Sequence, residues 1–125
     1  MRDYLTTEDI LGIHAVLVQR YGGASSIREK EGLEAAIFRP QNGYYQNIVE
    51  EGCALMESLL VNHPFLDGNK RTAFAAFDVF LKINGYSLRA DNATLYKAIL
   101  SWLETPSGDR FEKMVATLTP MIEKS

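Results

Sequence analysis

The sequence predicts a single all-α domain. Apolar residues recur at helical spacing in five or six segments, turn signals separate the segments, and almost no stretch alternates apolar and polar residues as a strand does. The chain has 125 residues, 46% apolar and 23% charged, a composition typical of one compact globular domain. Residues 1–125 are therefore expected to form one domain of five to six helices around a buried central helix.

The first part of the chain predicts two helices and an irregular segment. Thr6–Thr7 can cap a helix that stops at Gly22–Gly23. A short helix follows over Leu33–Phe38 and ends before Pro40. The stretch Gln41–Tyr45 combines turn residues with two aromatic residues, which predicts an exposed flap or a hairpin.

Two helices are expected in the middle of the chain. Helical spacing of apolar residues covers Val49–Asn62, and Pro64 disfavours helical geometry at His63. The segment Lys70–Ile83 is apolar on almost every side, so we expect it to be the buried central helix. Asn84–Gly85 supplies its C-terminal stop.

The last part of the chain predicts two more helices. Asp91 or Asn92 can cap the first, and Pro106–Gly108 separates it from the second. Pro120 falls inside the apolar pattern of the last helix and should kink or end it.

Charge and cysteine content exclude several classes of function. The only cysteine, Cys53, cannot form an internal disulfide, and its apolar neighbours favour a buried thiol in a reducing compartment such as the cytoplasm. No apolar run approaches the roughly 20 residues of a membrane helix. With 13 basic and 16 acidic residues, the chain lacks the positive surface that drives nucleic-acid binding. Neither a membrane nor a nucleic acid is therefore expected as a direct partner.

The segment His63–Arg71 carries most of the polar chemistry. Gly68 allows a ligand to approach the backbone, and the free N–H groups at the start of the helix near Asn69 attract anions. Lys70 and Arg71 add two cations at the same helix end. These features predict a phosphate site, although a simple capping turn with solvated cations explains the residue types equally well.

Two further side chains of this segment suggest catalysis. Asp67 can hold a magnesium ion whose other ligands are waters and phosphate oxygens. His63 is the side chain best suited to take a proton from an incoming hydroxyl. His14 falls on the apolar face of the first helix, so we interpret it as a buried structural histidine outside the site.

The segment His63–Arg71 resembles the Fic motif, which reads HPFx(D/E)GNGRxxR in the nucleotidyl-transferring branch of the Fic/Doc superfamily. Lys70 stands where that branch has glycine, and Phe74 stands where it has a second arginine. Both differences resemble the Doc (death-on-curing) branch. Other stretches similar to Doc landmarks are Tyr21–Gly23, Glu31–Leu33, Arg39–Gln41 and Phe80–Tyr86.

This resemblance implies a Fic-like helical fold and a toxin that uses ATP and Mg²⁺ to phosphorylate a threonine of elongation factor Tu. It also implies a cognate, Phd-like antitoxin that covers the active-site groove. By residue type Tyr44 and Tyr45 fit edge residues packed on the domain slightly better than a docking role, but by the same resemblance they belong to a flap that docks the target protein. The residues matched to functional positions are His63 as base, Asp67 as magnesium ligand, and Gly68, Asn69, Lys70 and Arg71 as phosphate cradle.

Three other functions remain as alternatives. Adenylyl (AMP) transfer to a target hydroxyl is disfavoured because the side chain of Lys70 fills the volume that glycine would leave for a further phosphate. An antitoxin-binding module with little catalysis is disfavoured because His63 and Asp67 are intact. A toxin ribonuclease conflicts with the acidic charge balance.

Overall fold

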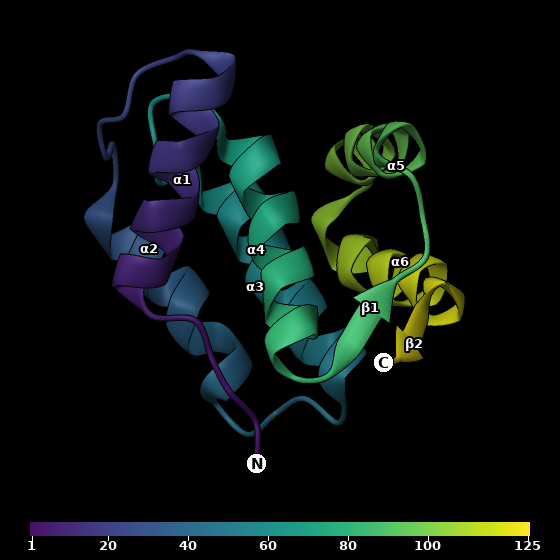
Figure 1. Ribbon diagram of the computed structural model, residues 1–125. Helices are drawn as coiled ribbons and strands as arrows, with labels where there is room; N and C mark the ends of the chain where they lie inside the picture. The colour runs from purple at the N-terminus through teal and green to yellow at the C-terminus, as the bar shows by residue number, and fades with distance from the viewer.

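The computed structural model describes residues 1–125 as six α-helices with two short 3₁₀ helices and one two-stranded sheet (Figure 1). This arrangement confirms the all-α prediction. The elements in chain order are α1 (Thr7–Tyr21), α2 (Lys30–Phe38), η1 (Arg39–Gln41), α3 (Ile48–Asn62), α4 (Asn69–Ile83), β1 (Tyr86–Leu88), α5 (Asn92–Glu104), α6 (Ser107–Leu118), η2 (Thr119–Met121) and β2 (Ile122–Lys124).

Side-chain caps begin three of the helices. Thr6 caps α1 in a capping box with Asp9, where each side chain bonds the other residue's backbone N–H. Asn47 and Asp91 cap α3 and α5 without such a box, each by accepting one bond from a backbone N–H of the first turn. The N–H of Thr94 bonds the Asp91 carboxylate and lowers the pKa of that carboxyl. The predicted caps of the first and fifth helices are thus confirmed.

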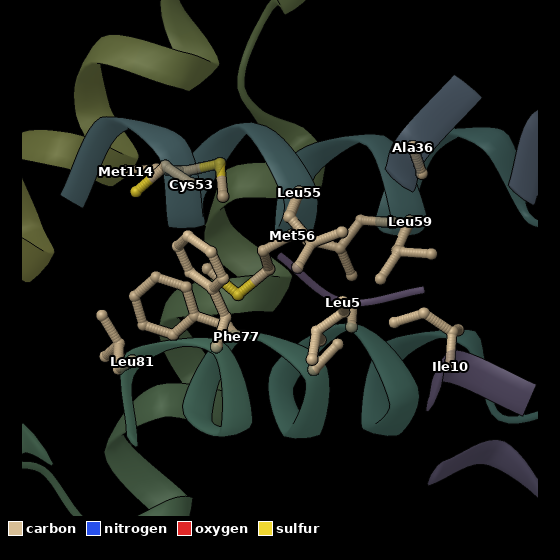
Figure 2. Packing of buried hydrophobic residues seen from close by; sticks show 14 of the residues in the cluster. Leu5, Ile10, Ala36, Cys53, Leu55, Met56, Leu59, Phe77, Leu81 and Met114 are labelled. Atoms are coloured by element: carbon tan, nitrogen blue, oxygen red, sulfur yellow. The ribbon is translucent and has the colours of Figure 1, made fainter. Parts of the chain in front are cut away.

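The core forms where α3 packs against α4. Figure 2 shows Met56 of α3 beside Phe77 of α4, and Leu59 farther along α3 on the side of Ile10 from α1. The helices approach closely because Gly52 has no side chain, and a Cβ there would lie 2.7 Å from a Phe77 ring carbon. Cys53 on the same helix is fully buried, and burial raises the pKa of its thiol, as expected for a structural cysteine.

The most enclosed helix is α3, which corrects the expectation that Lys70–Ile83 would be the buried central helix. Every residue from Glu51 to Leu60 is buried, whereas α4 keeps partly exposed residues such as Phe74 and Val79. The reason is that α2, α4 and α6 all contact α3, so its polar residues are covered as well. Glu57 is one of them, and it is paired with Arg39 and Arg110.

The only sheet is a pair of three-residue strands that the sequence pattern did not reveal. β1 runs antiparallel to β2, with Ser87 opposite Glu123, and so fastens the chain end to the C-terminal side of α4. Pro120 ends α6 at Leu118, as predicted. The predicted flap Gln41–Tyr45 contains no strand: Gln41 ends η1, and the residues after it form an irregular connection into α3. None of the helices combines the length and apolar character that a bilayer span requires.

Candidate functional site

The loop between α3 and α4 begins with a strained residue. His63 ends α3 in the left-handed region, with φ 46° and ψ 57°, and no other non-glycine residue has a positive φ. This conformation costs about 1 kcal/mol or more for a residue with a side chain, so the surroundings must hold it. Pro64 contributes by excluding the right-handed helical conformation at His63. The result is an imidazole exposed just beyond the helix end.

Arg28, from the segment between α1 and α2, holds this helix end. Its Nε donates to the carbonyl oxygen of His63 at 2.8 Å, and its Nη2 donates to that of Asn62 at 3.0 Å. Its backbone N–H also donates to the carbonyl oxygen of Pro64 at 2.7 Å. These bonds satisfy carbonyl groups that the end of a helix leaves without partners. The sequence offered no signal for this role, because Arg28 is distant from the loop in sequence.

A buried histidine supports the loop from below. His14 of α1 is 2% exposed, which confirms that it is buried. Its ring stacks on Phe65 with 3.7 Å between centroids, and its Nε2 donates to the carbonyl oxygen of Asp67 at 2.8 Å. Phe65 is itself 1% exposed and anchors the loop in the core. His14 therefore connects α1 to the loop, a role that its place on an apolar helix face did not reveal.

Asp67 turns its carboxylate toward the Gly22–Gly23 turn. Its Oδ2 accepts a bond from the N–H of Ala24 at 2.8 Å. Gly23 approaches so closely that a Cβ there would lie 3.1 Å from the Asp67 Cβ. The Oδ1 atom makes no hydrogen bond, and the chain has no group of three or more metal-binding side chains. This donor set fits a Mg²⁺ ion held by one carboxylate oxygen, waters and phosphates, and it does not fit a closed metal site.

The start of α4 provides the anion-binding end of the site. Gly68 precedes the helix with φ 77°, and no side chain caps it. The first helical hydrogen bond of α4 runs from the N–H of Thr72 to the carbonyl oxygen of Gly68, at 2.9 Å. The backbone N–H groups of Asn69–Arg71 therefore have no acceptor within the helix. The side chain of Asn69 bonds both backbone groups of Phe65, so it braces the loop, and the backbone N–H of Asn69 stays available to a ligand.

These groups line one cavity of about 340 Å³. It brings together all six predicted catalytic, metal-binding and phosphate-binding residues, from His63 to Arg71. The guanidinium of Arg71 lies 4.4 Å from the ring centroid of Tyr21, in cation–π geometry. Tyr96 of α5 also lines the cavity. Tyr96 lies outside the apolar face of α5, and this position was the only sign in the sequence that its side chain could take part in the site.

The structure does not bring Tyr44 and Tyr45 to this cavity. They precede α3, whereas His63 ends it, and a helix of 15 residues is about 22 Å long. Figure 1 shows the two ends of α3 at opposite ends of the molecule. The hydroxyl of Tyr45 accepts a bond from Arg39 at 2.7 Å. Burial alone would lower the pKa of Arg39, because it disfavours the charged form. The hydrogen bonds to Tyr45 and Glu57 have the larger combined effect and raise the pKa of Arg39.

The segment between α1 and α2 lies beside the loop instead. Ile27 forms an antiparallel bridge with Phe65, and the carbonyl of Ser26 accepts a bond from the N–H of Leu66 at 3.2 Å. Because successive residues of an extended strand point their backbone groups to opposite sides, those of Ile27 face away from the loop. This segment therefore presents a short free strand edge next to the site.

Comparison with known proteins identifies the family. The sequence profile of the Fic/DOC family matches residues 4–81, which include the whole loop. Toxin Doc of Mycolicibacterium smegmatis is 41% identical over 96 residues, covering 73% of this chain and 72% of that protein. Protein kinase doc of Escherichia phage P1 is 30% identical over 86 residues, covering 66% of this chain and 68% of that protein. The chain therefore belongs to the Fic/DOC family, and within it to the Doc branch.

Proposed function

We propose that this protein is the toxin of a toxin–antitoxin module and transfers the γ-phosphate of ATP to a serine or threonine hydroxyl of a translation factor. One observation carries the proposal: an exposed imidazole, a free carboxylate oxygen and a cationic helix N-terminus line the same cavity. The relatives named as a toxin and as a protein kinase support it. Elongation factor Tu is the proposed target, on the resemblance to Doc proteins, and the cytoplasm is the proposed location.

In the proposed reaction His63 takes the proton of the target hydroxyl, whose oxygen attacks the γ-phosphorus. The bond from that phosphorus to the leaving oxygen breaks, and ADP departs. Lys70, Arg71 and the free N–H groups of α4 stabilise the charge on the transferring phosphoryl group. Asp67 is the residue that would hold Mg²⁺, and the ion would neutralise charge on the phosphate oxygens. The products are a phosphorylated protein and ADP.

Phosphoryl transfer is favoured over adenylyl transfer by two side chains. Lys70 lines the cavity where the nucleotidyl-transferring branch has glycine, so it occupies space that a phosphate beyond the reacting one would need. Phe74 replaces the second arginine of that branch and offers no charge to such a phosphate. Without that glycine and that arginine to hold a pyrophosphate leaving group, the triphosphate is expected to enter reversed, with its terminal phosphate near His63.

We assign target docking to the strand edge at Ile27 rather than to Tyr44 and Tyr45. An extended target segment can pair with the free backbone groups of Ile27, which would bring a hydroxyl side chain toward His63. Ile27 and Leu66 both expose apolar side chains beside this edge, as interaction sites do. Tyr44 is 77% exposed but lies at the far end of α3.

The transfer is tested by incubating the protein with elongation factor Tu, Mg²⁺ and ATP labelled separately at its α and γ positions. We expect label from the γ position on the target, with ADP released, and no transfer with the His63→Ala variant. Label from the α position together with pyrophosphate release would replace phosphoryl transfer by adenylyl transfer. No label from either position would exclude the proposed target or the reaction.

The proposed antitoxin is a short segment, encoded next to this protein, that folds as it covers the groove beside the site. Its expected effect is loss of both nucleotide binding and transfer in the purified complex. Titration of ATP into the complex measures this directly, and a complex that binds ATP as the free toxin does would contradict the model of inhibition.

A further inference from the structure

A second cavity continues the active site along α4. It has a volume of about 650 Å³ and lies between α1, α4 and α5. Lys70, Arg71 and Tyr96 line both this cavity and the loop cavity, so the two are continuous. The reaction proposed above uses only the loop cavity, which leaves the role of the second one open.

Each of the three helices contributes one face to this groove. α4 contributes Arg71, Ala75 and Asp78, which follow each other at intervals of one helical turn. Ala93 at the start of α5 and Ala75 on α4 are small residues, so the helices leave space between them. From Arg71 to Asp78 the groove follows α4 for about 10 Å.

The chemistry of the groove changes along this length. The end next to the loop carries the cations Lys70 and Arg71. Aromatic rings follow, with Tyr21 and Tyr96 on opposite helices, 55% and 48% exposed. At the far end lies Asp78, whose charge is paired with Lys82 at 2.7 Å.

The other residues of the groove agree with this gradient. Phe74, Leu17 and Ile99 add apolar surface, Arg20 adds a third cation, and Asn92 adds an exposed amide. An amide can both donate and accept hydrogen bonds, as the edge of a nucleobase requires. A ligand that matches the whole groove has phosphates at one end and a flat, polar-edged ring at the other.

We infer that this groove binds the nucleoside end of the donor nucleotide, with the base against Phe74, bordered by Tyr96 on one side and on the other by Tyr21, over whose ring the Arg71 guanidinium lies. The inference rests on the proposed function, because it takes the phosphates to lie at the start of α4. The base stacks on aromatic side chains, which stabilises nucleotide binding without strict selection among bases. It also gives Phe74 a role: a ring supports the base where an arginine would bind a phosphate.

The experiment compares ATP with tripolyphosphate, which has the phosphates but no nucleoside. Isothermal titration in the presence of Mg²⁺ measures the affinity of both ligands for the wild type and for Ala75→Leu and Ala93→Leu, which fill the groove. Both positions are at least partly exposed, and leucine is a good helix former, so the variants should fold. Ala15→Leu is the matched control, because Ala15 is exposed on α1 and does not line the groove.

We expect the two groove variants to weaken ATP binding roughly tenfold or more, with tripolyphosphate affinity unchanged and no effect of the control. In the wild type, nuclear Overhauser effects between adenine protons and the Phe74 ring provide a second measurement that needs no substitution. ATP affinity unchanged by groove filling, or no tighter than that of tripolyphosphate in the wild type, overturns the inference and leaves the proposed function intact. Failure of the wild type to bind either ligand overturns both.

Discussion

Replacing His14 tests how α1 controls the active-site loop. The Asp67 carbonyl can only accept a hydrogen bond, so His14 must carry a proton on Nε2. His14→Phe preserves the stacking on Phe65 but removes this donor, whereas His14→Gln can preserve the donor but removes the stacking. The two variants therefore separate the two interactions of one buried side chain.

The expected losses follow from the geometry. Removing the buried donor of this 2.8 Å hydrogen bond leaves its acceptor without a partner, which should lower the free energy of unfolding by about 1–2 kcal/mol. Parallel ring stacking at 3.7 Å contributes about 0.5–1.5 kcal/mol. Because the bonded carbonyl belongs to Asp67, His14→Phe should also loosen the carboxylate and raise the Mg²⁺ concentration needed for half-maximal transfer.

Urea denaturation and a Mg²⁺ titration of the transfer reaction measure both effects. His14→Phe should lose about 1–2 kcal/mol and shift the Mg²⁺ titration, whereas His14→Gln should lose stability with a smaller shift. If His14→Phe keeps both the stability and the Mg²⁺ dependence of the wild type, the bond to Asp67 does not position the loop, and His14 is only a core residue.

Three further variants address the site. His63→Ala should lower transfer roughly 100-fold or more in a steady-state assay while circular dichroism stays unchanged, because the imidazole is exposed and the bond from Arg28 reaches the backbone carbonyl of His63, which alanine keeps; normal activity would remove its role as base. Asp67→Asn keeps an acceptor for Ala24 but loses the charge, so Mg²⁺ titration should show a higher requirement, and an unchanged one would place the ligand elsewhere. Arg28→Ala should reduce the turnover number with little effect on the KM for ATP, because it frees the backbone of His63; a change in KM alone would contradict this.

The sequence predicted the parts of the site that lie close together along the chain. Pro64 next to His63 marks the helix end, and glycine with two cations before an apolar helix marks an anion-binding N-terminus. These signals depend on local geometry, so they hold in the folded chain. Asn69 is the exception, because its side chain reaches back to Phe65 rather than toward a ligand, and residue type alone does not tell which way an amide turns.

Support from distant segments could not be predicted in this way. Arg28 bonds the end of α3 across 35 residues, and His14 bonds the loop across 53. Nothing in the local pattern around either residue indicates such a partner. Only the resemblance to the family indicates target docking at Tyr44 and Tyr45, and chain order does not reveal that this segment lies at the opposite end of α3.

The loop cavity is formed mainly by one segment of the chain, whereas the groove is formed by three helices. This difference affects how each can change without the other. The loop cavity is built largely from consecutive residues, so a short motif conserves its geometry when the rest of the chain changes. The groove is lined by several residues from each of α1, α4 and α5, and most of these residues lie outside the motif. If the groove holds the nucleoside as inferred above, a substitution at Tyr21 or Ala93 changes how firmly the nucleotide is held without altering the groups that perform the transfer. Proteins that share the motif need not share the orientation of their nucleotide, and Lys70 and Arg71, which line both cavities, are the motif residues that connect the two.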